Sequence, residues 1–314
     1  MLKIARERLE EFLFPAKSDI WITTLRVGLG VIVTLYALSL WRDWNYLFSA
    51  DSDALIRRDL AEAMLDLESS LIPRLGWLIT LLERVHCSEI ATLTLLRACL
   101  LGSGLLMVLG FFCRSAAVIA WLLHLATRGS GGFTSYGVDN FMTIGLFYLM
   151  LCPLPDRRSL DAYLWKGPVQ NPHRIGFHQR VLQLHLCFIY FFGGLAKCLG
   201  TGWWNGASMW RALTRSPFNI ISPEVLVRGS YFFPLVGICT CLLELGYPLL
   251  IWPKKTRVFC LSCILVMHTG IGLAMGLHLF ALIMIVFNLA GFGANLWPRP
   301  GNGIVSASRS SAPP

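Results

Sequence analysis

The sequence predicts an all-α, polytopic integral membrane protein, a bundle of about eight transmembrane helices with both termini in the cytoplasm. Of its 314 residues, 55% are hydrophobic and 14% are charged, and the mean hydropathy is +0.60. Soluble domains usually carry about 25% charged residues. In addition, apolar runs long enough to cross a hydrocarbon core of ~30 Å recur along the chain. A chain of this composition must therefore turn much of its surface toward lipid.

The apolar runs define the expected spans, and polar segments separate them. An amphipathic, charged N-terminus, 1–19, precedes a transmembrane domain, 20–297, and a polar tail rich in Ser and Pro, 298–314, is expected to be disordered. Within the domain, an outer loop, 41–89, contains a helically spaced stretch, 51–68, that we expect along the membrane surface. The runs are 20–40, 90–112, 115–127, 138–152, 181–197, 231–252, 258–275 and 277–297.

The charges support this division. Lys and Arg occur in each connection that an even number of spans leaves inside, and most loop acids lie in 41–89. This is the positive-inside pattern, and it places both termini in the cytoplasm. It also accounts for the net charge of +9, so the partner we expect is the lipid bilayer and not nucleic acid. The runs 115–127 and 138–152 are short, which leaves seven or nine spans as alternatives.

Several ionisable residues lie inside the apolar runs, where a charged side chain costs roughly 2.5–3.5 kcal/mol. Such residues must be paired or must face a wet cavity, and they mark candidate functional sites. Arg26 is near an inner end and is expected to reach the headgroups. Arg97 and Glu244 are expected to form a structural ion pair. The full set is Arg26, Arg97, His124, Asp139, His185, Lys197, Glu244, His268 and His278.

Four of these residues are expected to converge on one outward-facing cavity: Asp139, Lys197, His268 and His278. A Lys partly removed from water can act as a base, and His268 can relay protons. The histidines and cysteines lack the usual zinc spacing, so we expect no metal. The cysteines are expected as small core residues, with a Cys87–Cys198 disulfide as an alternative.

The most distinctive motif is YFFGGLAK, Tyr190–Lys197, followed by GWWNG, Gly202–Gly206. Two further motifs accompany it, GVDNF at 137–141 and Met267-His268 followed by MGLHLF at 275–280. Over 19–297 the chain resembles the HTTM domain, which is shared by vitamin K-dependent gamma-carboxylases and many stand-alone bacterial proteins. The resemblance implies the stand-alone type in a bacterial inner membrane.

The resemblance also implies a chemistry. Lys197 would be the base that deprotonates a reduced quinone of the menaquinone or vitamin K type, with His268 and Asp139 completing the catalytic group. Tyr190, Trp203, Trp204 and His278 would bind the quinone. This chain has Asp139 where the carboxylases have a His, and it ends soon after Trp297, without their large extracytoplasmic domain. Quinone oxidation or epoxidation without Glu carboxylation is therefore the expectation.

Two other function classes remain open from the sequence. One is a non-catalytic membrane subunit, or an assembly or maturation factor, whose partners would be other membrane proteins or a peptide substrate. The other is a transporter, which the intramembrane charges allow. No internal repeat of the kind found in transporters is apparent, so transport is the weaker alternative.

Overall fold

The computed structural model describes residues 2–51, 53–67, 71–131, 135–165 and 170–293, and within these ranges every regular element is helical. The predicted all-α class is therefore confirmed. The tail 298–314, for which disorder was expected, lies outside the described residues.

The long helices follow the predicted runs. They are α2 (Ile20–Ser39), α6 (Glu89–Leu109), α7 (Cys113–Ser130), α8 (Gly137–Leu151), α10 (Pro172–Cys198), α14 (Phe233–Leu250), α15 (Lys254–Met275) and α16 (His278–Asn288), which continues as the π-helical η3 (Leu289–Gly293). The shorter helices are α1 (Leu2–Leu13), α3 (Trp44–Phe48), α4 (Arg58–Asp66), α5 (Leu75–Glu83), α9 (Leu160–Trp165), α11 (Thr201–Trp204), α12 (Ala207–Thr214), α13 (Pro223–Gly229) and the 3-10 turn η2 (Ser230–Phe232).

One boundary differs from its prediction. The span expected from Val181 belongs to a helix that begins at Pro172, because Asn171 caps it by accepting a hydrogen bond from His173 N at 2.9 Å. Pro at the first position of a helix loses no hydrogen bond, and its fixed φ suits the helical turn. The polar first turns of α10 are held by the N-terminal segment, since Lys17 N donates to Pro172 O at 3.1 Å.

In the part of the chain that the structure describes, length and hydropathy identify 5 helices that can cross a membrane: α2, α6, α10, α15 and the stretch Pro223–Leu250 that contains α14. Helices α8 and α16 are apolar but shorter. On α15, Phe259, Val266 and Leu273 are spaced by seven residues and are 70%, 72% and 69% exposed, so they form one outward apolar face. A soluble helix would not leave such a face in water, and we conclude that this is a membrane protein.

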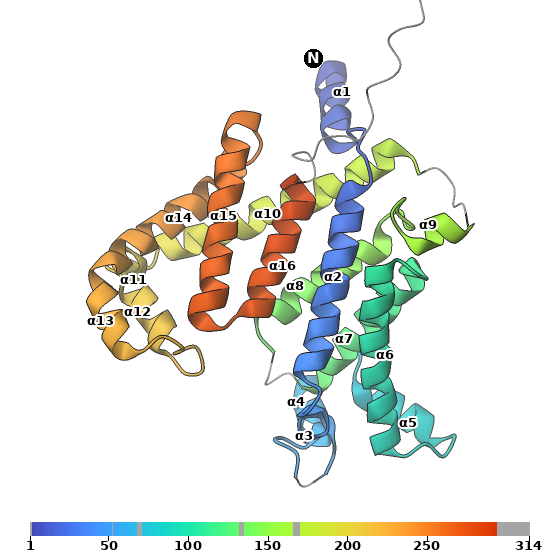
Figure 1. Cartoon of the computed structure of the whole chain (residues 1–314). Helices are drawn as coiled ribbons and strands as arrows, with labels where there is room; N and C mark the ends of the chain where they lie inside the picture. The colour runs from blue at the N-terminus through green and yellow to red at the C-terminus, as the bar shows by residue number, and fades with distance from the viewer. Residues whose placement is uncertain (1, 52, 68–70, 132–134, 166–169, 294–314) are drawn as a thin grey trace, which may run out of the picture.

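Helix α2 forms the centre of the bundle and packs against α6, α8 and α16, while α10 pairs with α14, and α15 with α16 (Figure 1). The crossing of α2 and α6 depends on two glycines. A Cβ added at Gly30 would lie 2.8 Å from Val108 N, and one at Gly104 would lie 2.9 Å from Thr34 N. Small residues at such crossings let backbones approach closely, which is how helices associate in lipid.

The connections between the long helices alternate between two ends of the bundle (Figure 1). Helices α1 and α9 mark one end, and α3, α4 and α5 mark the other. The expected surface stretch 51–68 contains α4, which polar contacts fix to the rest of this end. Glu62 accepts hydrogen bonds from Gly76 N at 3.0 Å and from Ser130 Oγ at 2.5 Å, and Arg58 pairs with Glu89 at 3.1 Å.

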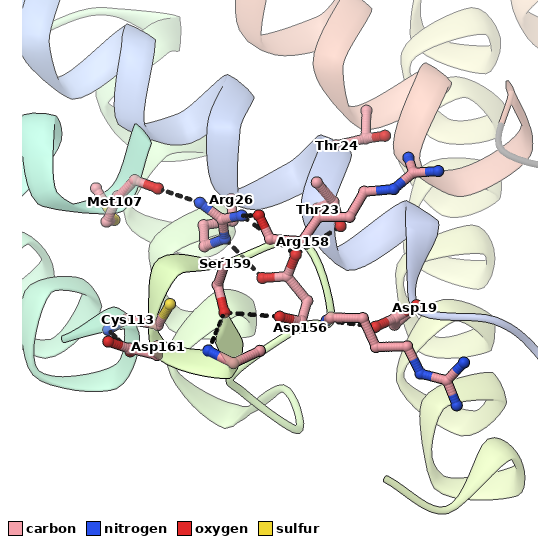
Figure 2. A network of polar contacts seen from close by, with 12 residues as sticks. Asp19, Thr23, Thr24, Arg26, Met107, Cys113, Asp156, Arg158, Ser159 and Asp161 are labelled. Carbon is pink, nitrogen blue, oxygen red and sulfur yellow. Dashed lines mark hydrogen bonds and ion pairs between the residues drawn. The ribbon is translucent and has the colours of Figure 1, made fainter. Parts of the chain in front are cut away.

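At the end that carries α9, Arg26 is fully buried in a polar network (Figure 2). Its Nε lies 2.7 Å from Asp156 Oδ1, and its Nη2 lies 3.2 Å from Asp156 Oδ2. Its Nη1 donates to Met107 O at 2.5 Å and to Val108 O at 3.1 Å, at the C-terminus of α6. Nη2 also donates to Arg158 O at 3.5 Å, which completes the five N–H donors of a guanidinium.

The expectation that Arg26 reaches the headgroups is therefore wrong. Its side chain is 1% exposed, and Asp156, which is 0% exposed, neutralises it. The segment 156–161, which contains Asp156, also caps α7. Asp161 accepts hydrogen bonds from Phe112 N at 2.8 Å and from Cys113 N at 2.7 Å, at the start of that helix. We call Arg26, Asp156 and Asp161 the inner cluster. It joins α2, the α6–α7 turn and the 156–161 loop.

Candidate functional site

The second polar group lies on α10, α14, α15 and α16, and α10 supplies Tyr190 and Lys197. These residues are seven positions apart, so they share one face of the helix. Between them, Gly193 and Gly194 let α14 approach, because a Cβ at Gly194 would lie 2.6 Å from Leu245 N. The glycines of the YFFGGLAK motif are thus explained by close packing of α10 on α14.

Lys197 forms an ion pair with Glu244 of α14, with 2.5 Å between Nζ and Oε2. The Lys197 side chain is 26% exposed and that of Glu244 is 9% exposed. The expected Arg97–Glu244 pair is therefore wrong. Arg97 instead donates to Trp41 O at 2.8 Å and lies 3.9 Å above the centre of the Trp41 ring. Helix order gives the depth of a side chain but not its direction, and Arg97 faces Trp41.

Two turns before Lys197, on the same face of α10, Tyr190 belongs to a buried chain of hydrogen bonds. Tyr190 Oη is 2.8 Å from His268 Nε2, and Asn288 Nδ2 donates to the same Oη at 2.7 Å. Tyr247 Oη donates to Asn288 Oδ1 at 2.8 Å. The chain thus links α14, α10, α15 and α16. We call Lys197, Glu244, Tyr190, His268 and Asn288 the outer cluster.

The hydrogen bonds assign the tautomer of His268. Asn288 Nδ2 also donates to Met284 O at 2.8 Å, which fixes the orientation of the amide. Tyr190 Oη accepts from Asn288, and His268 Nε2 is its other polar contact among the described residues, so the buried hydroxyl proton is satisfied only if Tyr190 donates it to Nε2. The neutral imidazole then carries its proton on Nδ1, and this buried atom has no hydrogen-bond partner among the described residues. An unpaired buried donor costs free energy unless a ligand accepts from it.

Asp139 does not join the outer cluster. It lies in the first turn of α8, where its carboxylate accepts from Tyr136 N at 2.8 Å. His124 Nε2 on α7 contacts Asp139 O at 3.1 Å, and the ring of Tyr36 on α2 packs edge-on against His124. The structure thus gives Asp139 a role at the start of α8, in contact with α2 and α7, and gives Lys197 a different carboxylate, that of Glu244.

Two of the remaining predicted binding residues, Trp203 and Trp204, lie around the end of α10. The ring centre of Trp203 is 5.5 Å from Lys197 Nζ, and Trp204 Nε1 donates to Cys198 O at 2.7 Å. His278 opens α16 and is exposed. His185 contacts Tyr148 Oη at 2.6 Å, away from the predicted set. The structure therefore brings together Lys197, His268, Tyr190 and Trp203.

The cysteines of the described residues are free, so the alternative Cys87–Cys198 disulfide is not formed. No group of three His, Cys, Asp or Glu that could hold a metal ion occurs in the part of the chain that the structure describes.

Sequence reasoning missed three members of these networks: Asp156, Asn288 and Tyr247. Asp156 follows Pro153-Leu154-Pro155 and belongs to a predicted loop, so it was not considered as a partner for Arg26. Asn288 is a polar residue within the apolar run of α16, and that contrast is a signal that sequence alone provides. Glu244 was identified, but with the wrong partner.

Comparison with protein-family profiles gives a match over most of the chain. The profile described as the HTTM domain matches residues 72–295, which include α5–α16, Lys197, Glu244 and His268. No curated protein and no solved structure matches the chain.

Proposed function

Because this chain belongs to the HTTM domain family, we propose that it is a membrane enzyme of the gamma-carboxylase-like kind that oxidises a reduced quinone to its epoxide. The substrate class is a hydroquinone of the menaquinone or vitamin K type. In the balanced reaction, hydroquinone and dioxygen give quinone epoxide and water. Lys197 is the base that takes the first hydroxyl proton, and the outer cluster binds the quinone ring.

The observation that carries this proposal is the buried Nδ1 of His268. Its proton has no acceptor among the described residues, while Nε2 is held by Tyr190 at 2.8 Å. A quinone or hydroquinone oxygen is an acceptor of the right kind, and binding would remove the cost of the unpaired donor. Tyr190, which contacts His268, also lies on the same face of α10 as Lys197, so the proposed ring-binding site lies along this face.

An opposite charge in contact favours the ammonium form of a lysine, so in the proposed mechanism Glu244 must accept the proton that Lys197 loses before it acts as a base. Separate buried charges are costly in a medium of low dielectric, and a close pair can avoid that cost by holding its proton on the carboxyl. With 2.5 Å between Nζ and Oε2, transfer of one proton to Glu244 leaves a neutral amine. Only the neutral amine can accept a proton from a hydroxyl group. Glu244 is thus the carboxylate beside Lys197, where the sequence had led us to expect Asp139.

We also propose that α2, α6, α7, α8, α10, α14, α15 and α16 each cross the bacterial inner membrane once, with α1 in the cytoplasm. Two observations support this topology: the connections alternate between the ends of the bundle, and Lys254, Lys255 and Arg257 follow α14 at the α1 end. A membrane-impermeant maleimide added to intact spheroplasts checks it, since it should label Cys87 without permeabilisation. Labelling of Cys87 only after permeabilisation would reverse the topology.

The test of the activity uses the full chain in mild detergent, reduced menaquinone, air and chromatography of the epoxide. Lys197→Met should lower epoxide formation by roughly 100- to 10,000-fold, the usual effect of a general base. His268→Gln should also lower it, because Nδ1 is lost. Arg97→Met removes a cation at similar depth outside the cluster, and it serves as the matched control with wild-type activity.

Two results overturn the proposal. Epoxide formation that survives Lys197→Met rules out Lys197 as the base. No epoxide from a monodisperse wild-type protein rules out the activity and favours a non-catalytic subunit of a larger membrane complex, to be sought by gentle purification with its partners.

A further inference from the structure

Helix α14 presents one buried face to the end of α10 and to α11, and this face carries a thiol. Gly237, Cys241 and Glu244 are spaced by four and three residues, so they form a row along the helix. Gly237 meets the main chain of Trp203, and Glu244 meets Lys197. Cys241 is therefore placed between the Gly237–Trp203 contact and the Lys197–Glu244 pair of the outer cluster.

The partner of Cys241 in this row is Cys198. The packing contacts of Gly194 with Leu245 and of Trp203 with Gly237 show that α10 and the chain after it run antiparallel to α14. Cys198 lies one turn after Gly194 and Cys241 one turn before Leu245, so the two thiols lie on facing turns beside the Lys197–Glu244 pair. Cys198 directly follows Lys197, and its carbonyl is fixed by Trp204 Nε1 at 2.7 Å. Cys241 is 0% exposed, whereas Cys198 is partly exposed. One accessible thiol beside one buried thiol is the arrangement in which the first reacts and the second resolves.

We propose that Cys198 and Cys241 are a redox-active dithiol that reduces a quinone bound at the outer cluster. The inference rests on the proposed quinone site and adds a source of reducing equivalents to it. The epoxidation consumes reduced quinone, so a reaction that regenerates hydroquinone from quinone at the same place supplies its substrate.

The step is balanced. Each thiol loses its S–H proton, one S–S bond forms, and two electrons and two protons pass to the two oxygens of the quinone, which becomes a hydroquinone. The disulfide is then reduced by a second dithiol, for which a small-molecule dithiol substitutes in the experiment. Lys197 and Glu244 lie beside Cys241 and can carry the protons.

The experiment uses the full-length protein in mild detergent, reduced with dithiothreitol, freed of it and kept without oxygen. Menaquinone is the probe, because its ring carbons are substituted and do not add thiols. We expect about one hydroquinone per chain, together with a disulfide-linked peptide pair that contains Cys198 and Cys241. Alkylation of free thiols followed by peptide mass mapping identifies the linked pair.

The variants Cys198→Ser and Cys241→Ser should lose both the hydroquinone and the linked peptide. Cys239→Ser is the matched control, because Cys239 lies on the same helix and is exposed. Quinone that stays oxidised while Cys198 and Cys241 stay open to alkylation in the wild type overturns the proposal. Because this result comes from the wild-type protein, it tests the dithiol proposal even if a serine variant does not fold.

A parallel reaction separates this inference from the proposed function. Wild-type protein is given menaquinone that has been reduced beforehand, in air, and epoxide is measured. If epoxide forms in air but no Cys198–Cys241 disulfide forms in the anaerobic reaction, the dithiol proposal alone is overturned. Disulfide and hydroquinone without epoxide overturn the epoxidation and leave the dithiol in place.

Discussion

The inner and outer clusters each hold a basic residue opposite a carboxylate at membrane depth, but they use their polar atoms differently. In the inner cluster both side chains are almost fully buried: the exposed fraction is 1% for Arg26 and 0% for Asp156. Every N–H of the Arg26 guanidinium has an acceptor. In the outer cluster Lys197 is 26% exposed, and His268 Nδ1 lacks a partner.

This difference indicates different roles. A network in which every donor is satisfied is rigid and has nothing to offer a ligand. A network with an unpaired buried donor and an accessible amine can bind a ligand through both groups. Ionisable residues inside a membrane mark functional sites by default. The inner cluster departs from that rule, because its charges hold α2, the α6–α7 turn and the 156–161 loop together.

The largest effect should come from breaking the inner cluster. Arg26→Met leaves the Asp156 carboxylate buried without its counter-charge, and loss of one partner of such a pair costs about 3–5 kcal/mol. We expect a large loss of thermal stability in detergent, measured as the temperature at which the monodisperse fraction falls to half. Arg158→Met, which changes an exposed arginine in the same loop, is the control and should melt like the wild type. Equal melting of both variants would show that the inner cluster does not hold the fold.

How far the sequence predicts this fold is clear from α2 and Asp156. The run 20–40 predicts α2, Ile20–Ser39, almost to the residue, because an apolar run of that length has few other structures in lipid. The partner of Arg26 could not be read in the same way. Asp156 is far from Arg26 in the sequence and belongs to a predicted loop, so only the fold brings its carboxylate into contact with Arg26 of α2. Local pattern fixes the elements, whereas long-range pairs depend on helix rotation.

The candidate site shows the same limit. Lys197, Tyr190 and His268 could be predicted, because polar residues stand out in apolar runs and the YFFGGLAK motif carries two of them. Asp139 also stands out, yet its carboxylate caps Tyr136 N and does not turn toward Lys197. Depth along a helix can be counted from sequence, but the direction of a side chain cannot.

A smaller loss of stability is expected from a substitution in the α6–α7 turn, which packs against the inner cluster. Gly110 ends α6 with φ +74°, and a Cβ there would lie 2.7 Å from Ser159 Cα and 2.9 Å from Arg26 Nη1. Gly110→Ala should therefore destabilise the fold by about 1–3 kcal/mol, through backbone strain and displacement of the loop. Gly102→Ala on the same helix has nothing within 4 Å of the added Cβ and is the matched control. It should be neutral or stabilising by about 0.5–1 kcal/mol, because Ala favours a helix interior. A Gly110→Ala variant as stable as Gly102→Ala would contradict the tight packing of this turn.

The smallest effect tests which cation pairs with Glu244. Double-mutant cycles with Lys197→Met, Arg97→Met and Glu244→Gln compare the two pairings directly. Residues in contact couple by about 0.5–3 kcal/mol, whereas separate residues add to within about 0.3–0.5 kcal/mol. The Lys197–Glu244 cycle should show coupling, since the two groups are 2.5 Å apart. The Arg97–Glu244 cycle should be additive, because Arg97 is occupied by the Trp41 carbonyl and ring. Thermal stability in detergent measures both cycles. If Arg97 and not Lys197 couples to Glu244, the outer cluster loses its ion pair, Lys197 becomes an isolated cation, and the proton transfer to Glu244 that makes Lys197 a base falls with it.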